Sequence, residues 1–154
     1  MLKHRILVAD PDHSLLTAYK QYLTAEGFVA ATARTGSECV ERLFEFSPNV
    51  LVLDPKVLGG SAEGFLGMTL DDDNVSRLHV IILTEPEDDD IRAELAPFPV
   101  AAWHVKPFGP AALTKQIRSL LGSGTSSDVF VTEWAQDETA FSKSEEILVA
   151  DSPV

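Results

Sequence analysis

The sequence predicts one α/β domain, an open five-stranded parallel sheet that is doubly wound by five helices. Five apolar runs of strand length recur along the chain, at residues 6–9, 28–31, 50–53, 80–83 and 100–103. Continuous apolar runs of this kind are typical of strands buried on both faces of a sheet. Segments of helical periodicity separate the runs, and this alternation predicts right-handed crossovers between parallel strands.

The five helices are predicted from apolar periodicity and from their end signals. The first ends before Gly27, and its apolar face carries Leu15, Leu16, Tyr19, Tyr22 and Leu23. The second opens at Gly36 and closes at Ser47-Pro48, and a short third is expected over about 64–70. The acidic run 87–90 is read as the start of the fourth, because a helix N-terminus favours negative charge, and the fifth is expected over 110–121.

Composition and charge exclude several classes of protein. The net charge of −12 argues against direct binding to nucleic-acid phosphates or to anionic membranes. No apolar run approaches 18 residues, so no membrane span is expected, and the run after the basic start is too short for a signal peptide. Cys39 is the single cysteine, so no internal disulfide can form and a cytoplasmic setting is expected.

Polar side chains with related chemistry follow four of the predicted strands. Asp10 and Asp12 follow the first, Asp54 the third, Thr84 the fourth and Lys106 the fifth. Ligands of open parallel sheets bind outside the carboxyl ends of the strands, so these side chains are expected to converge. Converging carboxylates favour a hard cation such as Mg²⁺, and a lysine and a hydroxyl can bind a phosphoryl group. The set predicts phosphoryl transfer to an aspartate.

Four segments carry a resemblance to a known family: Ile6–Asp12, Val50–Asp54, Ile81–Glu85 and Trp103–Phe108. Together they resemble the receiver domains of two-component response regulators, chemotaxis regulators among them, over about residues 4–121. The resemblance implies a flavodoxin-like (βα)5 fold for a domain at 1–121. It also implies a cytoplasmic signalling domain, in which self-catalysed phosphoryl transfer and autodephosphorylation are the most enzyme-like activities.

The resemblance assigns the acceptor and the metal ligands. Asp54 would take a phosphoryl group from a sensor histidine kinase or a histidine phosphotransfer protein. Asp10, Asp54 and the backbone carbonyl of Lys56 would hold Mg²⁺. Receivers usually carry a second acid where this chain has Pro11, which offers no side-chain ligand. Asp12 is the nearest substitute, and Mg²⁺ binding is therefore expected to be weak.

The resemblance also assigns the residues that respond to phosphorylation. Thr84 would move toward the acyl phosphate, Lys106 would bridge to its oxygens, and Trp103 stands where the family has a rotating aromatic residue. The Lys106-Pro107 bond matches one that is cis in the family. A homodimer through the face of the fourth helix, fifth strand and fifth helix is a further expectation.

Departures from the family pattern leave alternatives open. Glu85 follows the switch threonine where a small residue is usual, and it could point to solvent or repel incoming phosphodonors. Together with Pro11, it allows a degenerate receiver that acts through protein contacts without phosphorylation. A flavin-binding protein of the same sheet order is a weaker reading, because Asp10-Pro11-Asp12 would repel a phosphate.

The last 33 residues, 122–154, have the composition of a Gly/Ser linker followed by an acidic tail. Residues 147–151 repeat the pentapeptide of residues 6–10, and Asp151-Ser152-Pro153-Val154 reads like the loop after a receiver's first strand. The repeat suggests the start of a second receiver domain. A tail strand docked on a sheet edge and a solvated acidic tail are the alternatives.

Overall fold

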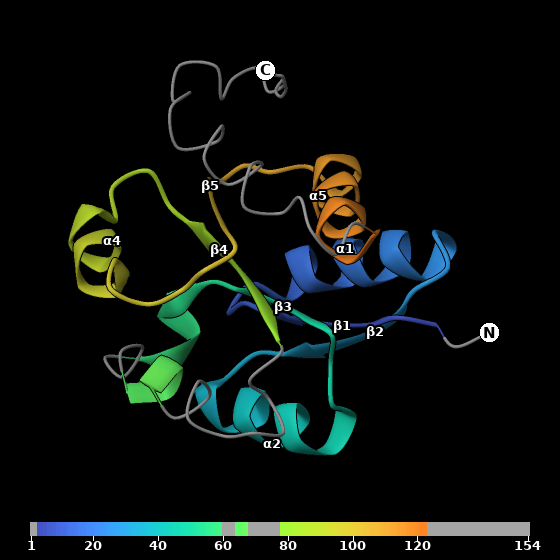
Figure 1. The fold of residues 1–154 in the computed structure, drawn as a ribbon, viewed down its shortest axis with the longest axis horizontal. Helices are drawn as coiled ribbons and strands as arrows, with labels where there is room; N and C mark the ends of the chain where they lie inside the picture. Colours follow the sequence, from blue (N-terminus) through green and yellow to red (C-terminus); the bar gives the residue numbers. More distant parts are fainter. Residues whose placement is uncertain (1–2, 60–63, 68–77, 123–154) are drawn as a thin grey trace.

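The predicted parallel sheet is present in the structure, a computed structural model that describes residues 3–59, 64–67 and 78–122. Five parallel strands are ordered β2-β1-β3-β4-β5, so the strand order reverses beside β1 (Figure 1). Their bounds are Arg5–Ala9 (β1), Val29–Ala33 (β2), Val50–Leu53 (β3), His79–Thr84 (β4) and Ala102–Val105 (β5).

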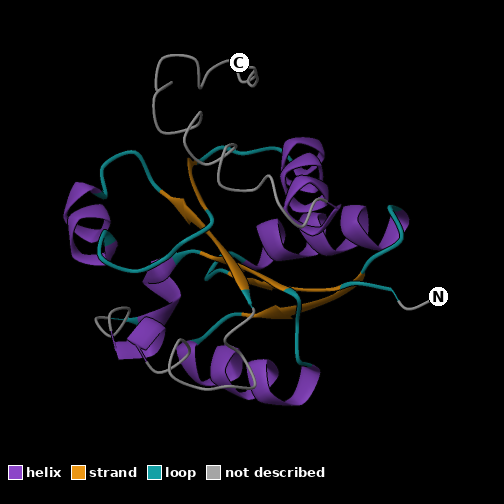
Figure 2. Ribbon diagram, in the orientation of Figure 1, coloured by secondary structure: helices purple, strands orange, loops and turns teal. Residues whose placement is uncertain are grey.

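Helices cover both faces of the sheet, which confirms the doubly wound class (Figure 2). Helices α1 and α5 lie together on one face, and α2 and α4 lie on the other (Figure 1). Their bounds are His13–Ala25 (α1), Gly36–Phe46 (α2), Asp89–Leu95 (α4) and Pro110–Gly122 (α5), with a 3-10 helix, η1, at Pro55–Leu58. Residues 64–67 are helical, whereas 68–70 of the predicted third helix lie outside the described residues.

Two hydrophobic cores, one on each face, explain why the strand sequences are apolar without alternation. In β1, Leu7 packs toward α2 while Ile6 and Val8 pack toward α1 and α5. The same division runs through β3, where Leu51 faces one core and Val50 the other. Since both faces of each central strand are buried, every position must be apolar until the strand reaches the carboxyl edge.

Local signals fix where the helices begin and end. The Asp12 carboxylate accepts backbone N–H groups of the first turn of α1, and Thr35 caps α2 in the same way. Gly27 has a φ of 98°, a conformation that residues with a side chain rarely adopt, and it turns the chain from α1 into β2. The predicted stop at Gly27 is confirmed.

Several predicted boundaries differ from the structure by one or two residues. Strand β5 covers 102–105 and not 100–103, because His104 is buried within it although its ring is polar. Strand β2 begins at Val29 and extends to Ala33. Helix α4 begins at Asp89 and not at Glu87, because the Asp88 carboxylate bonds to the backbone N–H of Glu85 and makes no cap bond.

The linker was predicted to begin at Gly122, but Gly122 is the last residue of α5. The rest of the predicted linker and acidic tail, with the suggested start of a second receiver, falls at residues 123–154, outside the described residues. Within the described part of the chain, no helix has the length and apolar character that crossing a bilayer requires.

Candidate functional site

The carboxyl ends of three strands place an acid, a second acid and a lysine beside one another. Asp10 follows β1, Asp54 follows β3 and Lys106 follows β5. Backbone hydrogen bonds extend the sheet to these positions, since Asp54 N donates to Ala9 O at 2.9 Å and Lys106 N donates to Thr84 O at 2.8 Å. The three side chains are therefore positioned by the sheet itself.

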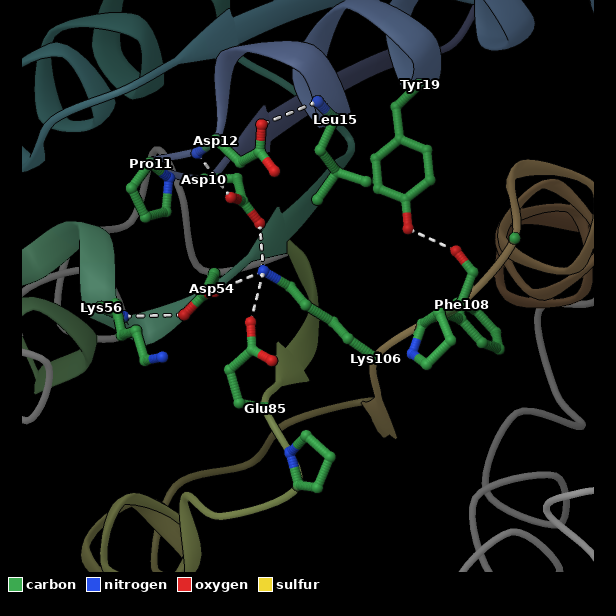
Figure 3. Close-up of a pocket in the computed structure, with 13 residues that line it drawn as sticks. Asp10, Pro11, Asp12, Leu15, Tyr19, Asp54, Lys56, Glu85, Lys106 and Phe108 are labelled. Atoms are coloured by element: carbon green, nitrogen blue, oxygen red, sulfur yellow. Dashed lines mark hydrogen bonds and ion pairs between the residues drawn. The ribbon is translucent and has the colours of Figure 1, made fainter.

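The Lys106 ammonium bridges the two acids (Figure 3). Its Nζ lies 2.7 Å from Asp10 Oδ2 and 2.6 Å from Asp54 Oδ2, and both aspartates are only 2% exposed. Burial lowers the pKa of Lys106, but the hydrogen bonds to Asp10 and Asp54 outweigh it and the net shift is upward. Lys106 therefore stays charged and compensates two carboxylates that burial alone would destabilise.

The other oxygen of each carboxylate is held by the backbone. Asp12 N donates to Asp10 Oδ1 at 2.8 Å, and Lys56 N donates to Asp54 Oδ1 at 2.9 Å. Each acid is thus fixed at both oxygens before any ligand arrives. Fixed orientation is what transfer to a carboxylate needs, since a positioned nucleophile reacts without first losing rotational freedom.

Glu85 is a third acid at the same lysine, and of the two positions that the sequence left open for it, solvent or the site, the structure shows the site. Its Oε2 lies 3.7 Å from Lys106 Nζ, and its side chain is 34% exposed, so it approaches from the rim of the site. Figure 3 shows the carboxylate directed at Lys106 and not into solvent. The sequence signal for this placement is the position of Glu85 directly after β4, because that position lies at the same carboxyl edge of the sheet as Asp10 and Asp54.

Asp88 holds the loop that carries Glu85. The Asp88 carboxylate accepts the Glu85 N–H at 3.1 Å, and the Asp88 N–H donates to the Glu85 carbonyl at 3.1 Å. The same carboxylate lies 4.0 Å from Nζ of Lys56, in the 3-10 helix η1 that follows Asp54. The β4–α4 loop is therefore linked to the segment that follows the acceptor candidate.

These groups border an open cleft of about 720 Å³ at the carboxyl edge. The opposite wall is built by the loop after Lys106, whose bond to Pro107 is cis, as the resemblance implies. Tyr19 of α1 fixes this wall by donating its hydroxyl to the Phe108 carbonyl. Burial raises the pKa of Tyr19 to about 12, so the hydroxyl keeps its proton and remains a donor.

The two predicted switch residues lie away from the cleft. Thr84 is the last residue of β4, is 1% exposed and does not border the cleft. Trp103 packs against the core on the α2 and α4 face, with the Arg92 guanidinium 5.4 Å from its ring centroid. The structure brings together Asp10, Asp12, Asp54, Lys56 and Lys106 around the cleft, whereas Trp103 packs on the α2 and α4 face of the sheet.

Two carboxylates of the site fit a hard divalent cation. Asp10 and Asp54 each direct one oxygen at the same point, now served by Lys106, and carboxylate oxygens are the ligands that Mg²⁺ prefers. The Lys56 carbonyl accepts the Gly59 N–H at 3.2 Å, and Asp12 Oδ1 caps α1. Across 3–59, 64–67 and 78–122, no three His, Cys, Asp or Glu side chains are grouped as a metal site. The side chains that could bind the cation are therefore few, chiefly Asp10 and Asp54.

Comparisons with known proteins agree with this fold. The chemotaxis response regulator of Vibrio cholerae is 20% identical, with 78% of this chain and all of that chain covered and a TM-score of 0.69. A receiver domain protein from Methanospirillum hungatei is 22% identical, with 79% and 95% covered and a TM-score of 0.70. At these identities, the likeness shows the fold alone. The family model for the response regulator receiver domain matches residues 6–118, and the chain therefore belongs to the receiver-domain family of two-component response regulators.

Proposed function

We propose that the chain is a phospho-accepting receiver domain in which Asp54 takes a phosphoryl group from a histidine kinase or a histidine phosphotransfer protein. Receiver domains are signalling domains that interact with such proteins, and they are not classical enzymes. The observation that carries the proposal is the bridge from Lys106 to Asp54 and Asp10. A nucleophilic carboxylate, a partly buried ammonium and an open cleft beside them are the features that phosphoryl transfer requires.

The chemistry follows from the positions of these groups. A carboxylate oxygen of Asp54 forms a bond to the phosphorus while the bond from phosphorus to the donor's imidazole nitrogen breaks. The leaving imidazole takes up a proton from solvent. Lys106 can exchange one carboxylate partner for a phosphoryl oxygen, because its ammonium carries three donors. The backbone N–H of Lys56 keeps the acceptor oriented throughout.

Asp54→Asn is expected to abolish a phosphate-sized mass gain that the native chain shows with a phosphodonor and Mg²⁺. The amide is nearly isosteric but is a far weaker nucleophile than the carboxylate. The measurement is intact-protein mass spectrometry, with Asp90→Asn as control, since Asp90 is an exposed acid of α4. A mass gain retained in Asp54→Asn would assign the acceptor elsewhere.

A degenerate receiver that acts only by protein contact is the second candidate. Two observations favour it: Pro11 removes a metal ligand, and Glu85 places a negative charge at the lysine of the site. Absence of any mass gain in the native chain, with small phosphodonors and with phosphohistidine proteins alike, would select this alternative.

Weak Mg²⁺ binding follows from Pro11. Receiver domains generally bind Mg²⁺ at the acidic pocket, where the ion neutralises charge on the phosphoryl oxygens. Pro11→Asp adds a carboxylate beside Asp10, and we expect about tenfold tighter Mg²⁺ binding. Isothermal titration calorimetry measures the affinity. Pro11→Ala is the matched control, because it frees the backbone without adding a ligand, and equal affinity in Pro11→Asp and Pro11→Ala would contradict the prediction.

The face formed by α4, β5 and α5 is our proposed contact surface for a homodimer. Trp103 of β5 and Arg92 of α4 lie there in contact with each other, so a movement of the ring would change that surface. Sedimentation of the native chain before and after phosphorylation tests whether this homodimer forms.

A further inference from the structure

The Lys106 ammonium has three carboxylates around it, and they are not equivalent. Asp10 and Asp54 lie 2.7 and 2.6 Å from Nζ, with side chains that are 3% and 1% exposed. Glu85 lies 3.7 Å away and is 34% exposed. The two aspartates are buried at the sheet edge, whereas Glu85 is partly exposed and lies at the rim of the cleft. An incoming phosphoryl group must enter this open cleft past Glu85.

The position of Glu85 is built into the loop. Its N–H and carbonyl are both bonded to Asp88, whose side chain is 11% exposed and pairs with Lys56. Lys56 in turn gives its N–H to Asp54. The backbone of the loop is therefore anchored to the segment that holds the acceptor, which keeps Glu85 within reach of Lys106.

Charge decides what this arrangement does. Three carboxylates and one ammonium leave the centre of the site with a formal charge of −2. A phosphoryl group transferred to Asp54 adds negative charge and needs Lys106 as its partner. Glu85 already occupies the solvent side of Lys106, so it repels the incoming group and also competes with it for the same ammonium.

We propose that Glu85 is an anionic gate that determines which phosphodonors Asp54 can use. This proposal rests on the proposed function. It slows transfer from small dianionic donors by competing for Lys106. A protein donor escapes this selection when a basic side chain beside its phosphohistidine pairs with Glu85 and releases Lys106. The gate therefore makes the receiver selective for a donor protein with a basic contact surface.

The first experiment compares the phosphorylation rates of the native chain and two variants with acetyl phosphate and Mg²⁺. Glu85→Gln should be phosphorylated about tenfold faster than the native chain at low ionic strength, with the gap narrowing as salt is added. Glu87→Gln is the matched control, because Glu87 is an exposed acid of the same loop and its replacement changes the charge equally. Its rate should stay within about twofold of native, as expected of an exposed charge that salt screens. A Glu85→Gln rate equal to that of native or of Glu87→Gln would overturn the gate.

A second measurement separates failure of the gate from failure of the proposed function. Beryllium trifluoride with Mg²⁺ is a phosphoryl analogue that binds a carboxylate without a transfer reaction, and isothermal titration calorimetry measures its affinity. Glu85→Gln should bind it about tenfold more tightly than native, since competition for Lys106 is removed. If no variant gains phosphate but this difference is seen, the acceptor function fails, whereas the competition of Glu85 for Lys106 stands. Equal affinities would overturn the gate even where Asp54 is phosphorylated.

Discussion

Lys106→Met is expected to lower the free energy of unfolding by about 3–5 kcal/mol at neutral pH, because it leaves buried carboxylates without their counter-charge. Asp10 and Asp54 are each 2% exposed and share this one ammonium at hydrogen-bond distance. Methionine keeps most of the side-chain volume, so the loss reports charge and not a cavity. Urea unfolding of the native and variant chains measures the difference.

The pH dependence of this loss has a definite sign. The net rise in the pKa of Lys106 above its usual value means that its stabilisation is complete below about pH 10.5 and declines at higher pH. In the variant, a crowded carboxylate can take up a proton that the unfolded chain does not bind. The variant's deficit should therefore shrink as the pH falls below neutrality.

Two companion variants make the result specific to the bridge. Lys56→Met removes a lysine of the same cleft whose side chain is 42% exposed and 4.0 Å from its acidic partner, and it should cost less than about 1 kcal/mol. Asp54→Asn added to Lys106→Met should recover part of the loss, because one buried charge disappears with its partner. A Lys106→Met chain as stable as native, or no more damaged than Lys56→Met, would contradict the bridge.

The strands could be predicted from the sequence because one simple packing rule determines their composition. Strands buried on both faces must be apolar throughout, so the runs that contain Leu7, Leu51 and Ile82 reveal the strands directly. The rule failed at β5, where the apolar run stops before His104 although the strand continues. His104 is tolerated inside because its Nε2 lies 2.6 Å from Gln116 Oε1 and its ring stacks on Phe108 at 4.0 Å. Such a partner, 12 residues away on α5, is not visible in local sequence.

The candidate site was partly predictable for a related reason. Parallel strands end at one edge, so the meeting of Asp10, Asp54 and Lys106 follows from topology alone. The direction of the Glu85 side chain does not, because it depends on how Asp88 bonds the loop. Asp12 illustrates the same limit, since the carboxylate considered as a metal ligand has one oxygen engaged in capping α1.

The buried His104 ring predicts loss of stability in mild acid. Burial lowers the pKa of His104 to about 4, and the hydrogen bond to Gln116 only partly offsets this shift. In the unfolded chain the ring is protonated near pH 6.5. Below that pH the unfolded state therefore binds more protons than the native state, and the free energy of unfolding falls.

The stability contributed by the neutral ring is complete above about pH 6.5 and is lost as the pH falls toward 4. Between pH 7 and pH 5 this one residue should cost about 2 kcal/mol. His79, whose pKa burial also lowers, adds a contribution of the same sign. The comparison is therefore made between variants and not on the native chain alone.

His104→Asn is expected to be less stable than native at pH 7, because it loses the stacking on Phe108, but its stability should fall by about 2 kcal/mol less between pH 7 and pH 5. Urea unfolding at the two pH values gives both quantities. His4→Gln is the matched control, since His4 is exposed and its replacement should leave the native pH dependence unchanged. An unaltered pH dependence in His104→Asn would show that the ring is protonated inside the fold as readily as in the unfolded chain, with Gln116 Oε1 accepting from the charged form.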